Sequence, residues 1–180
     1  MSGLHADAVT VLSAWEAPND HQEALRRHYL EYLAQNADGV WRSCRPSHLT
    51  AGMIILDHDG RHTLLVLHGR INLWVQPGGH CEPGDRSLME VAEREAREET
   101  GLAELVLDAK PIALSRHRSP CGAETHLDVQ YLGTSPAGAA PVVSDESHDV
   151  RWFPVSALPG ELASGVAESV ATAVAALVRR

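Results

Sequence analysis

Glutamates are concentrated in one segment of the chain, GGHCEPGDRSLMEVAEREAREETGL, which runs from Gly78 to Leu102. If the second half of this segment is a helix, Glu95 lies one turn before both Glu98 and Glu99, and three carboxylates crowd toward one face. Like charges at this spacing destabilise a helix, and the C-terminal half of a helix favours cations instead. A divalent cation would offset both penalties. Magnesium fits best, because it binds carboxylate oxygens and keeps positions open for phosphate.

A second interpretation of the segment is a solvated helix face. Ion pairs between Arg94 and Glu98 and between Arg97 and Glu93 would satisfy that interpretation, and such pairs are common on charged helices. It does not explain the Pro-Gly-Gly turn before the segment or Gly101 at the end of the helix. The combined pattern therefore favours a functional site.

The segment resembles the Nudix box, which is Gly, five residues, Glu, seven residues, Arg-Glu, an apolar residue, any residue, Glu-Glu, any residue, Gly and an apolar residue. Residues 94–102, REAREETGL, fill the second half, with Ala96 at the apolar position. The first half differs: Asp85 stands where the box has Glu, and eight residues rather than seven separate it from Arg94. This difference weakens the expectation of a role for Asp85. For Glu82 a salt bridge is expected.

The resemblance implies an α/β (α+β) fold, namely a Nudix-like α/β/α sandwich with a mixed β-sheet. It implies an enzyme, a Nudix-type pyrophosphohydrolase acting on phosphorus-containing acid anhydrides. In that reaction Mg²⁺ or Mn²⁺ holds the diphosphate while water attacks phosphorus, and the small-molecule substrate is a nucleoside diphosphate derivative. The family also implies the possibility of a homodimer.

Site residues follow from the resemblance position by position. The metal ligands are the carboxylates of Glu95, Glu98 and Glu99 and the main-chain carbonyl of Gly78. Either Glu98 or Glu99 accepts the proton of the attacking water. Arg94 pairs with a neighbouring carboxylate and fixes its direction, for which its planar guanidinium is suited.

Further candidates lie at the edge of the box and outside it. Gly78 and Gly79 allow main chain to approach the substrate closely. The catalytic base of this family sometimes lies in a late loop, and Glu146 in the acidic segment 144–149 is the candidate, with a solvated acidic turn as the open alternative. Arg116, in a predicted polar loop, is a candidate for contact with substrate phosphate or base.

Histidines and cysteines offer a different chemistry. A zinc site could be drawn from His117, Cys121 and His126, with Cys81 as a further ligand. None of these residues forms a dense pair such as Cys-x-x-Cys, which zinc sites usually contain. We therefore favour surface or substrate-loop histidines. The odd number of cysteines, with Cys44 as the third, predicts free thiols in a reducing cytosol.

The net charge and the lengths of the apolar runs limit the classes of partner that the chain is expected to bind. The 180 residues carry a net charge of −9, which argues against a sequence-independent grip on nucleic acid. No apolar run approaches the roughly 18 residues of a membrane span, and the N-terminus lacks a signal-peptide pattern. We expect a cytoplasmic protein with no membrane contact.

The helices and strands that must position the site are predicted from the spacing of apolar residues. Residues 1–45 are expected to form a helical extension, with two helices between Leu4 and Ala34 broken at Pro18, packed on the core or on a dimer partner rather than forming a substrate cap. Residues 46–180 form the Nudix domain. Its expected strands are 48–56, 62–67, 72–76, 105–107, 111–114, 126–132 and 150–153, with a polar loop at 115–125 and a last helix at 161–178. Trp74 and Trp152 are expected in the core, although either could line a pocket.

Two other functions are compatible with the fold. A non-catalytic Nudix-like nucleotide sensor would carry degenerate glutamates, whereas this box keeps them. An isoprenyl diphosphate isomerase needs its own cysteine and glutamate arrangement, which is not found. The intact Arg-Glu-x-x-Glu-Glu sequence favours the hydrolase.

Overall fold

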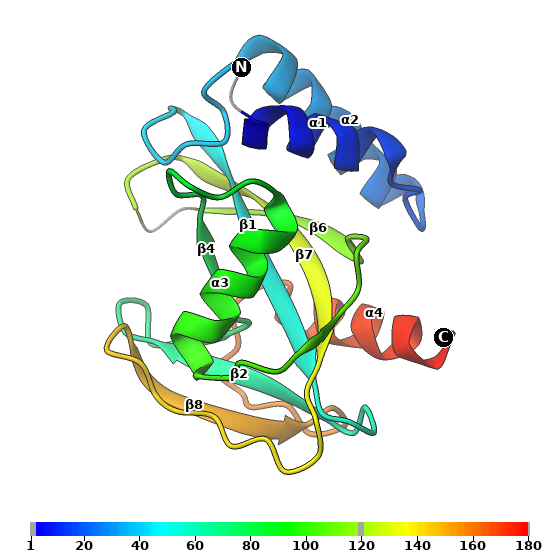
Figure 1. Cartoon of the computed structure of the whole chain (residues 1–180), viewed down its shortest axis with the longest axis vertical. Helices are drawn as coiled ribbons and strands as arrows, with labels where there is room; N and C mark the ends of the chain where they lie inside the picture. Colours follow the sequence, from blue (N-terminus) through cyan, green and yellow to red (C-terminus); the bar gives the residue numbers. More distant parts are fainter. Residues whose placement is uncertain (1–2, 119–120, 180) are drawn as a thin grey trace.

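Strand β1, Ser47–Leu56, is the centre of an eight-stranded mixed sheet in the computed structural model, which describes residues 3–118 and 121–179 (Figure 1). It pairs in parallel with β7, Thr125–Thr134, along its whole length. On its other side it pairs antiparallel with β4, Gly78–His80, at one end and with β2, His62–His68, at the other. All ten residues of β1 are buried, as expected for an apolar strand that is covered on both faces.

The remaining strands extend the sheet at both sides. β3 (Trp74–Val75) and β8 (Ser147–Pro154) pair antiparallel with β2, and β5 (Val106–Leu107) and β6 (Ala113–Arg118) pair antiparallel with β7. Two expectations were wrong. The predicted loop at 115–125 begins with strand residues, because 115–118 pair with β7, and its residues 119 and 120 lie outside the described part of the chain. The predicted glycine loop contains a strand, β4.

Two helices cover the opposite faces of the sheet, α3 (Leu88–Thr100) and α4 (Val166–Val178) (Figure 1). The side chains of β1 alternate between them. Odd-numbered residues such as Leu49 and Met53 belong to the hydrophobic cluster of α3, and even-numbered Ile54 and Leu56 belong to that of α4. The fold is therefore the expected α+β Nudix-like fold.

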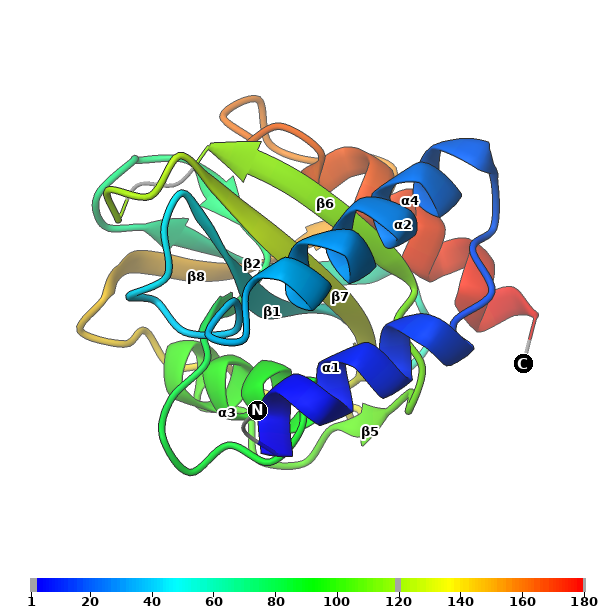
Figure 2. The same ribbon diagram turned by 90° about the horizontal axis from the view of Figure 1, so that it is seen from above.

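The N-terminal helices are α1 (Gly3–Ala14) and α2 (Asp20–Gln35), and they pack on the same cluster as α3. Asn19 caps α2 by accepting a hydrogen bond from the backbone N–H of Gln22. α1 lies against α3, and α2 lies against β6 (Figure 2). The carboxylate of Asp7 in α1 accepts the backbone N–H of Leu88 at 2.8 Å, at the first residue of α3. The expected packing of this helix pair on the core is confirmed.

Candidate active site

Helix α3 has well-defined ends, which place the glutamates in its second half. The side chain of Ser87 accepts the backbone N–H of Glu90 at 3.2 Å and so caps the first turn of the helix. At the other end Gly101 adopts a left-handed conformation, with φ 70°, and donates its N–H to the carbonyl of Arg97 at 2.8 Å. Glycine adopts this angle at little cost, so the helix stops directly after the glutamates.

The buried face of α3 determines which carboxylates face the sheet. Val91, Ala92 and Ala96 are fully buried against β1, so that the neighbouring Glu95 is also drawn toward the sheet. The side chain of Glu95 is only 13% exposed, whereas that of Glu98 is 57% exposed. Small Ala96 therefore lets the helix approach the sheet closely enough to shelter one carboxylate of the cluster while another remains open to solvent.

The surroundings of the cluster favour the protonated, uncharged form of its carboxylates. Burial raises the pKa of Glu99 to about 8; a hydrogen bond from Gly78 opposes this shift, and the carboxylates of Glu95, Glu146 and Glu98 add to it. Burial also raises the pKa of Glu95 to about 6, in spite of the nearby Arg94. Acidic groups with pKa values this high lack sufficient positive charge around them. A bound divalent cation would supply that charge and ionise them.

Strand β4 brings backbone to the carboxylates. The N–H of Gly78 donates to Oε2 of Glu99 at 2.9 Å. A Cβ at Gly79 would lie 2.5 Å from Oε1 of Glu95, and a Cβ at Gly78 would lie 2.6 Å from the Cα of Gly52 in β1. The two glycines are therefore needed because carboxylate and backbone approach them from opposite sides, rather than because of unusual backbone angles.

Arg94 connects the helix with the strand and with the turn between them. Its guanidinium donates to Glu95 at 3.0 Å and to Glu98 at 3.1 Å. It also donates to both oxygens of Asp85, at 3.2 and 3.1 Å, and to the backbone carbonyl of His80 at 2.8 Å. Since guanidinium is planar and always charged, these partners fix the directions of two carboxylates in the cluster.

Asp85 has a structural role that the sequence analysis did not expect. The turn at Pro83 and Gly84, where Gly84 has a φ of 119°, accommodates the additional residue of the box and leaves the Asp85 carboxylate 9% exposed against Arg94. The salt bridge that was expected of Glu82 is formed by Asp85. Among the described contacts Glu82 contributes its backbone N–H, which donates to Asp85 at 2.7 Å.

The ion pairs of the solvated-face interpretation are also present. Arg97 pairs with Glu93 at 2.8 Å, and Arg94 pairs with Glu98 at 3.1 Å, both four residues apart. Glu93 and Arg97 line a hollow on α3 together with Asp85, Arg94 and Glu98. The ion pairs of the solvated-face interpretation and the carboxylates of the box therefore occur on the same helix, and Arg94 and Glu98 belong to both.

Glu146 and Arg116, the candidates outside the box, have different surroundings. Glu146 lies in the segment between β7 and β8, and its charge raises the pKa of both Glu95 and Glu99, so it is within electrostatic reach of the cluster. Arg116 is exposed on β6, and its charge acts on Tyr29 in α2. No described contact brings Arg116 to the carboxylates of α3.

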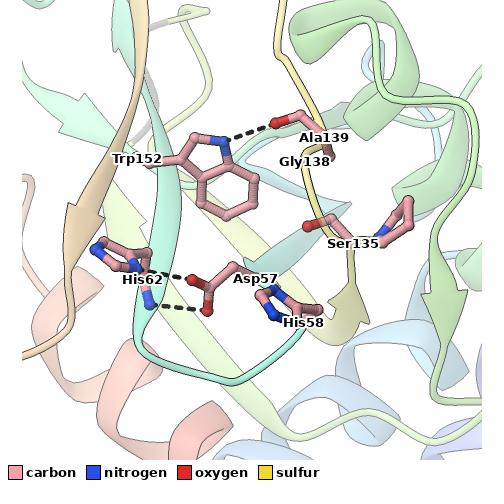
Figure 3. Close-up of a pocket in the computed structure, with 8 residues that line it drawn as sticks. Asp57, His58, His62, Ser135, Gly138, Ala139 and Trp152 are labelled. Carbon is pink, nitrogen blue, oxygen red and sulfur yellow. Dashed lines mark hydrogen bonds and ion pairs between the residues drawn. The ribbon is translucent and has the colours of Figure 1, made fainter.

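A hollow of about 290 Å³ lies between the turn after β1, the residues that follow β7, and Trp152 of β8 (Figure 3). Trp152 borders it, with its indole N–H donating to the carbonyl of Ala139 at 3.3 Å. The turn after β1 forms another wall, where Asp57 pairs with His62 at 2.7 Å. Trp74 is instead buried in the core, where its ring packs edge-on against Phe153. Only one of the two tryptophans thus lines an opening.

The carboxylates fit a divalent cation by the chemistry of their donors. Glu95, Glu98 and Glu99 offer hard oxygen ligands on one side of α3, and hard cations bind such oxygens. Burial, together with the neighbouring carboxylates, raises the pKa of Glu95 and of Glu99, and a bound divalent cation would offset both causes. The residues present therefore fit the kind of metal that the sequence predicts.

Comparison with known proteins identifies the family. Residues 46–173 match the family model of the NUDIX domain. The chain belongs to the Nudix family. Family and fold together support a Nudix-type pyrophosphohydrolase.

Solved structures with the Nudix fold resemble most of the chain. A NUDIX-family hydrolase from Clostridium perfringens has a TM-score of 0.62 and 22% identity over 72% of this chain and 97% of its own. An Ap4A hydrolase from C. elegans has a TM-score of 0.64 and 18% identity over 73% and 98%. The NUDIX domain of Shewanella oneidensis NrtR, complexed with ADP ribose, has a TM-score of 0.61 and 22% identity over 82% and 97%. At these identities the likeness establishes the fold.

Membrane insertion through a helix finds no support in the described residues. None of the helices formed by residues 3–118 and 121–179 has the length and apolar character to cross a bilayer. Cys44 and Cys81 are free thiols, as the sequence predicts.

Proposed function

We propose that this Nudix protein is a Mg²⁺- or Mn²⁺-dependent hydrolase that cleaves the diphosphate linkage of a nucleoside diphosphate derivative by attack of water at phosphorus. The observation that carries the proposal is the set of three carboxylates on α3 beside the backbone of β4, with the pKa values of Glu95 and Glu99 raised by burial. Such a site is stabilised by a cation, and a cation held there can bind a diphosphate.

Each residue of the cluster has a role in this proposal. The carboxylates of Glu95, Glu98 and Glu99, with the carbonyl of Gly78, would hold the cation. When bound, the cation neutralises phosphate charge and lowers the pKa of water. Arg94 keeps Glu95 and Glu98 in fixed directions through hydrogen bonds of 3.0 and 3.1 Å. Orientation of this kind matters because phosphoryl transfer depends mainly on positioning and charge.

A general base has to take the proton from the attacking water. Glu98 and Glu99 are candidates within the box, and Glu146 is the candidate outside it. Glu146 is supported by its electrostatic effect on Glu95 and Glu99, which places its charge near the cluster. Its position on a connecting segment would let it approach substrate independently of the helix.

The hollow beside Trp152 is our candidate for the organic part of the substrate. One connecting segment supplies both a wall of the hollow, at Gly138 and Ala139, and the proposed base Glu146. An indole ring offers a flat apolar surface suited to a nucleobase. A nucleotide substrate is also supported by the two structural neighbours whose names include Ap4A and ADP ribose.

The proposal is tested by incubating the full chain with nucleoside triphosphates, nucleoside diphosphate sugars, dinucleoside polyphosphates and ADP-ribose, each with Mg²⁺ or Mn²⁺. We expect one class to be hydrolysed, with turnover lost in Glu98→Gln and Glu99→Gln. Glu93→Gln is the matched control, because Glu93 is on the same helix but pairs with Arg97 and is not a member of the proposed ligand set. Binding of metal and nucleotide without any hydrolysis would refute the enzyme and favour a nucleotide sensor.

We further propose a cytoplasmic location and a homodimer. The free thiols of Cys44 and Cys81 support a reducing compartment. Sedimentation of the purified chain tests the dimer, and a sedimenting monomer at micromolar concentration would exclude it.

A further inference from the structure

Three histidines and a cysteine meet on the side of the sheet opposite α3. His48 lies in β1, His80 in β4 and His126 in β7, and Cys121 precedes β7. One ligand atom from each lies within 4.8 Å of the others. His48 and His126 are buried, at 0% and 6% exposure, so the interpretation of the cluster histidines as surface residues was wrong for His126.

The strand register explains why these residues meet. His48 is directly opposite His126 in the parallel pair of β1 and β7, and His80 is opposite Thr50, two residues farther along β1. Residues two apart in a strand share a face, so the register places the three imidazoles on one face across the neighbouring strands β4, β1 and β7. One sequence feature is consistent with this: His48 and Thr50 are polar residues at alternate positions of an otherwise apolar run.

The distances between the ligand atoms are those of a tetrahedral zinc site. Sγ of Cys121 lies 3.3 Å from Nε2 of His126 and 3.6 Å from Nε2 of His48. With Zn–S near 2.3 Å and Zn–N near 2.05 Å, two ligands of a tetrahedral zinc are about 3.5 Å apart. The two pairs that Cys121 forms with His48 and His126 therefore have the separation that zinc needs, and His80 lies within 4.8 Å of the same atoms.

The hydrogen bonding of the rings is also that of metal ligands. Nδ1 of His48 faces the carbonyl of Cys44 at 3.2 Å; by donating there it leaves Nε2 with a free lone pair toward Cys121. Nε2 of His80 is buried and has no hydrogen-bond partner among the described residues, which a ligand would explain. Ring centroids of His48, His80 and His126 are only 5.0–5.1 Å apart.

We propose that His48, His80, Cys121 and His126 bind one Zn²⁺ ion in a closed structural site, separate from the carboxylates of α3. Nitrogen and sulfur ligands select zinc over magnesium, which takes oxygen. Four protein ligands complete a tetrahedral shell and leave no position for substrate or water, as in structural zinc sites. The alternative is a metal-free cluster in which the thiol of Cys121 hydrogen-bonds the imidazoles.

The zinc would act on the active site through β4. This strand is only three residues long, and its backbone holds both Glu99, through the N–H of Gly78, and Arg94, through the carbonyl of His80. Attaching His80 to residues of β1 and β7 would fix β4 against the rest of the sheet. In this view zinc stabilises the position of the backbone to which the box is bonded, and it takes no part in the reaction.

The experiment measures metal content and metal spectra of the full chain. Protein purified from zinc-supplemented cells and dialysed against excess Mg²⁺, to occupy the carboxylates, is expected to retain one zinc per chain. Replacement by Co²⁺ is expected to give the sulfur-to-cobalt charge-transfer band of a thiolate ligand. Cys121→Ser is expected to abolish that band and to lower zinc affinity at least about 100-fold, since losing even a second-shell partner costs 10- to 100-fold.

Matched variants separate this site from others. The double variant Glu98→Gln/Glu99→Gln is expected to keep the zinc. His117→Gln is also expected to keep it, because the ring of His117 lies 5.4 Å from that of His126 but is outside the group of four. Hydrogen exchange at Gly78–His80 is expected to quicken when zinc is removed from the wild type. Absence of zinc from the folded wild type, or retention of zinc and the charge-transfer band in Cys121→Ser, would overturn the proposal. These readouts need no substrate, so they are independent of the proposed hydrolase.

Discussion

Replacing Gly79 by alanine tests whether the close approach of β4 to Glu95 is functional. A Cβ at this position would lie 2.5–2.7 Å from the three atoms of the Glu95 carboxylate. Because ordinary contacts begin near 3.5 Å, the carboxylate must move by about 1 Å. It is the tip of a flexible side chain, so we expect the fold to survive, with a loss of stability of at most about 1.5 kcal/mol for an altered rotamer.

The expected effect on function is much larger than the effect on stability. A displacement of about 1 Å in a catalytic group can reduce activity about 100-fold. We expect Gly79→Ala to lower kcat/KM by about that factor on the substrate found in the panel, and to weaken Mn²⁺ binding measured by electron paramagnetic resonance. Denaturation in urea measures the stability.

Two comparisons make this test decisive. Gly160→Ala is the matched control, because a Cβ there meets no atom within 4 Å, and full activity is expected. In a Glu95→Ala background the clash is gone, so adding Gly79→Ala should change Mn²⁺ affinity little. If Gly79→Ala is as active as Gly160→Ala, or if its effect persists unchanged without Glu95, the reasoning about this contact is refuted.

Other perturbations have expected outcomes of their own. Arg94→Lys removes the bidentate contact with Asp85 and is expected to cost about 2 kcal/mol of stability and most of the activity; wild-type behaviour in urea denaturation and in turnover would contradict it. Asp7→Ala removes the partner of the Leu88 N–H and is expected to cost about 1 kcal/mol while kcat stays unchanged, so a fall in kcat at normal stability would count against a purely structural role. Glu146→Gln is expected to lower kcat by about 100-fold or more with little change in melting temperature if this residue is the base; an unaltered kcat assigns the proton to the box. Chelation by EDTA is expected to stop hydrolysis, and Mg²⁺ to restore it.

Much of the fold could be predicted because strand and helix periodicities are local. The apolar run of β1 and the charged helix that carries Glu95, Glu98 and Glu99 are each visible within a short stretch of sequence, and both elements are where they were predicted. Strand β4 could not be predicted, because three residues that include two glycines have no strand pattern. Their pairing depends on β1, which lies more than twenty residues earlier in the chain.

The candidate sites also differ in how far local sequence could predict them. The carboxylates of α3 were visible because helical spacing alone brings them together. The partnership of Arg94 with Asp85 depends on how a turn accommodates one additional residue, which spacing alone does not determine. The group of His48, His80 and His126 depends on the register of three strands, of which β4 and β7 are distant from β1 in sequence. No compact sequence motif therefore indicates this group.

Gly79 and His80 face opposite sides of the sheet, and this alternation disfavours any other register of β4. Gly79 faces Glu95 on one side of the sheet, and His80 belongs to the cluster on the other side. A slip by one residue would turn each side chain to the opposite face. An imidazole would then be forced into the space that only glycine fits, and the histidine cluster would lose a member. A misaligned β4 is therefore penalised on both faces at once, and a chain that folds with one site intact has also assembled the other.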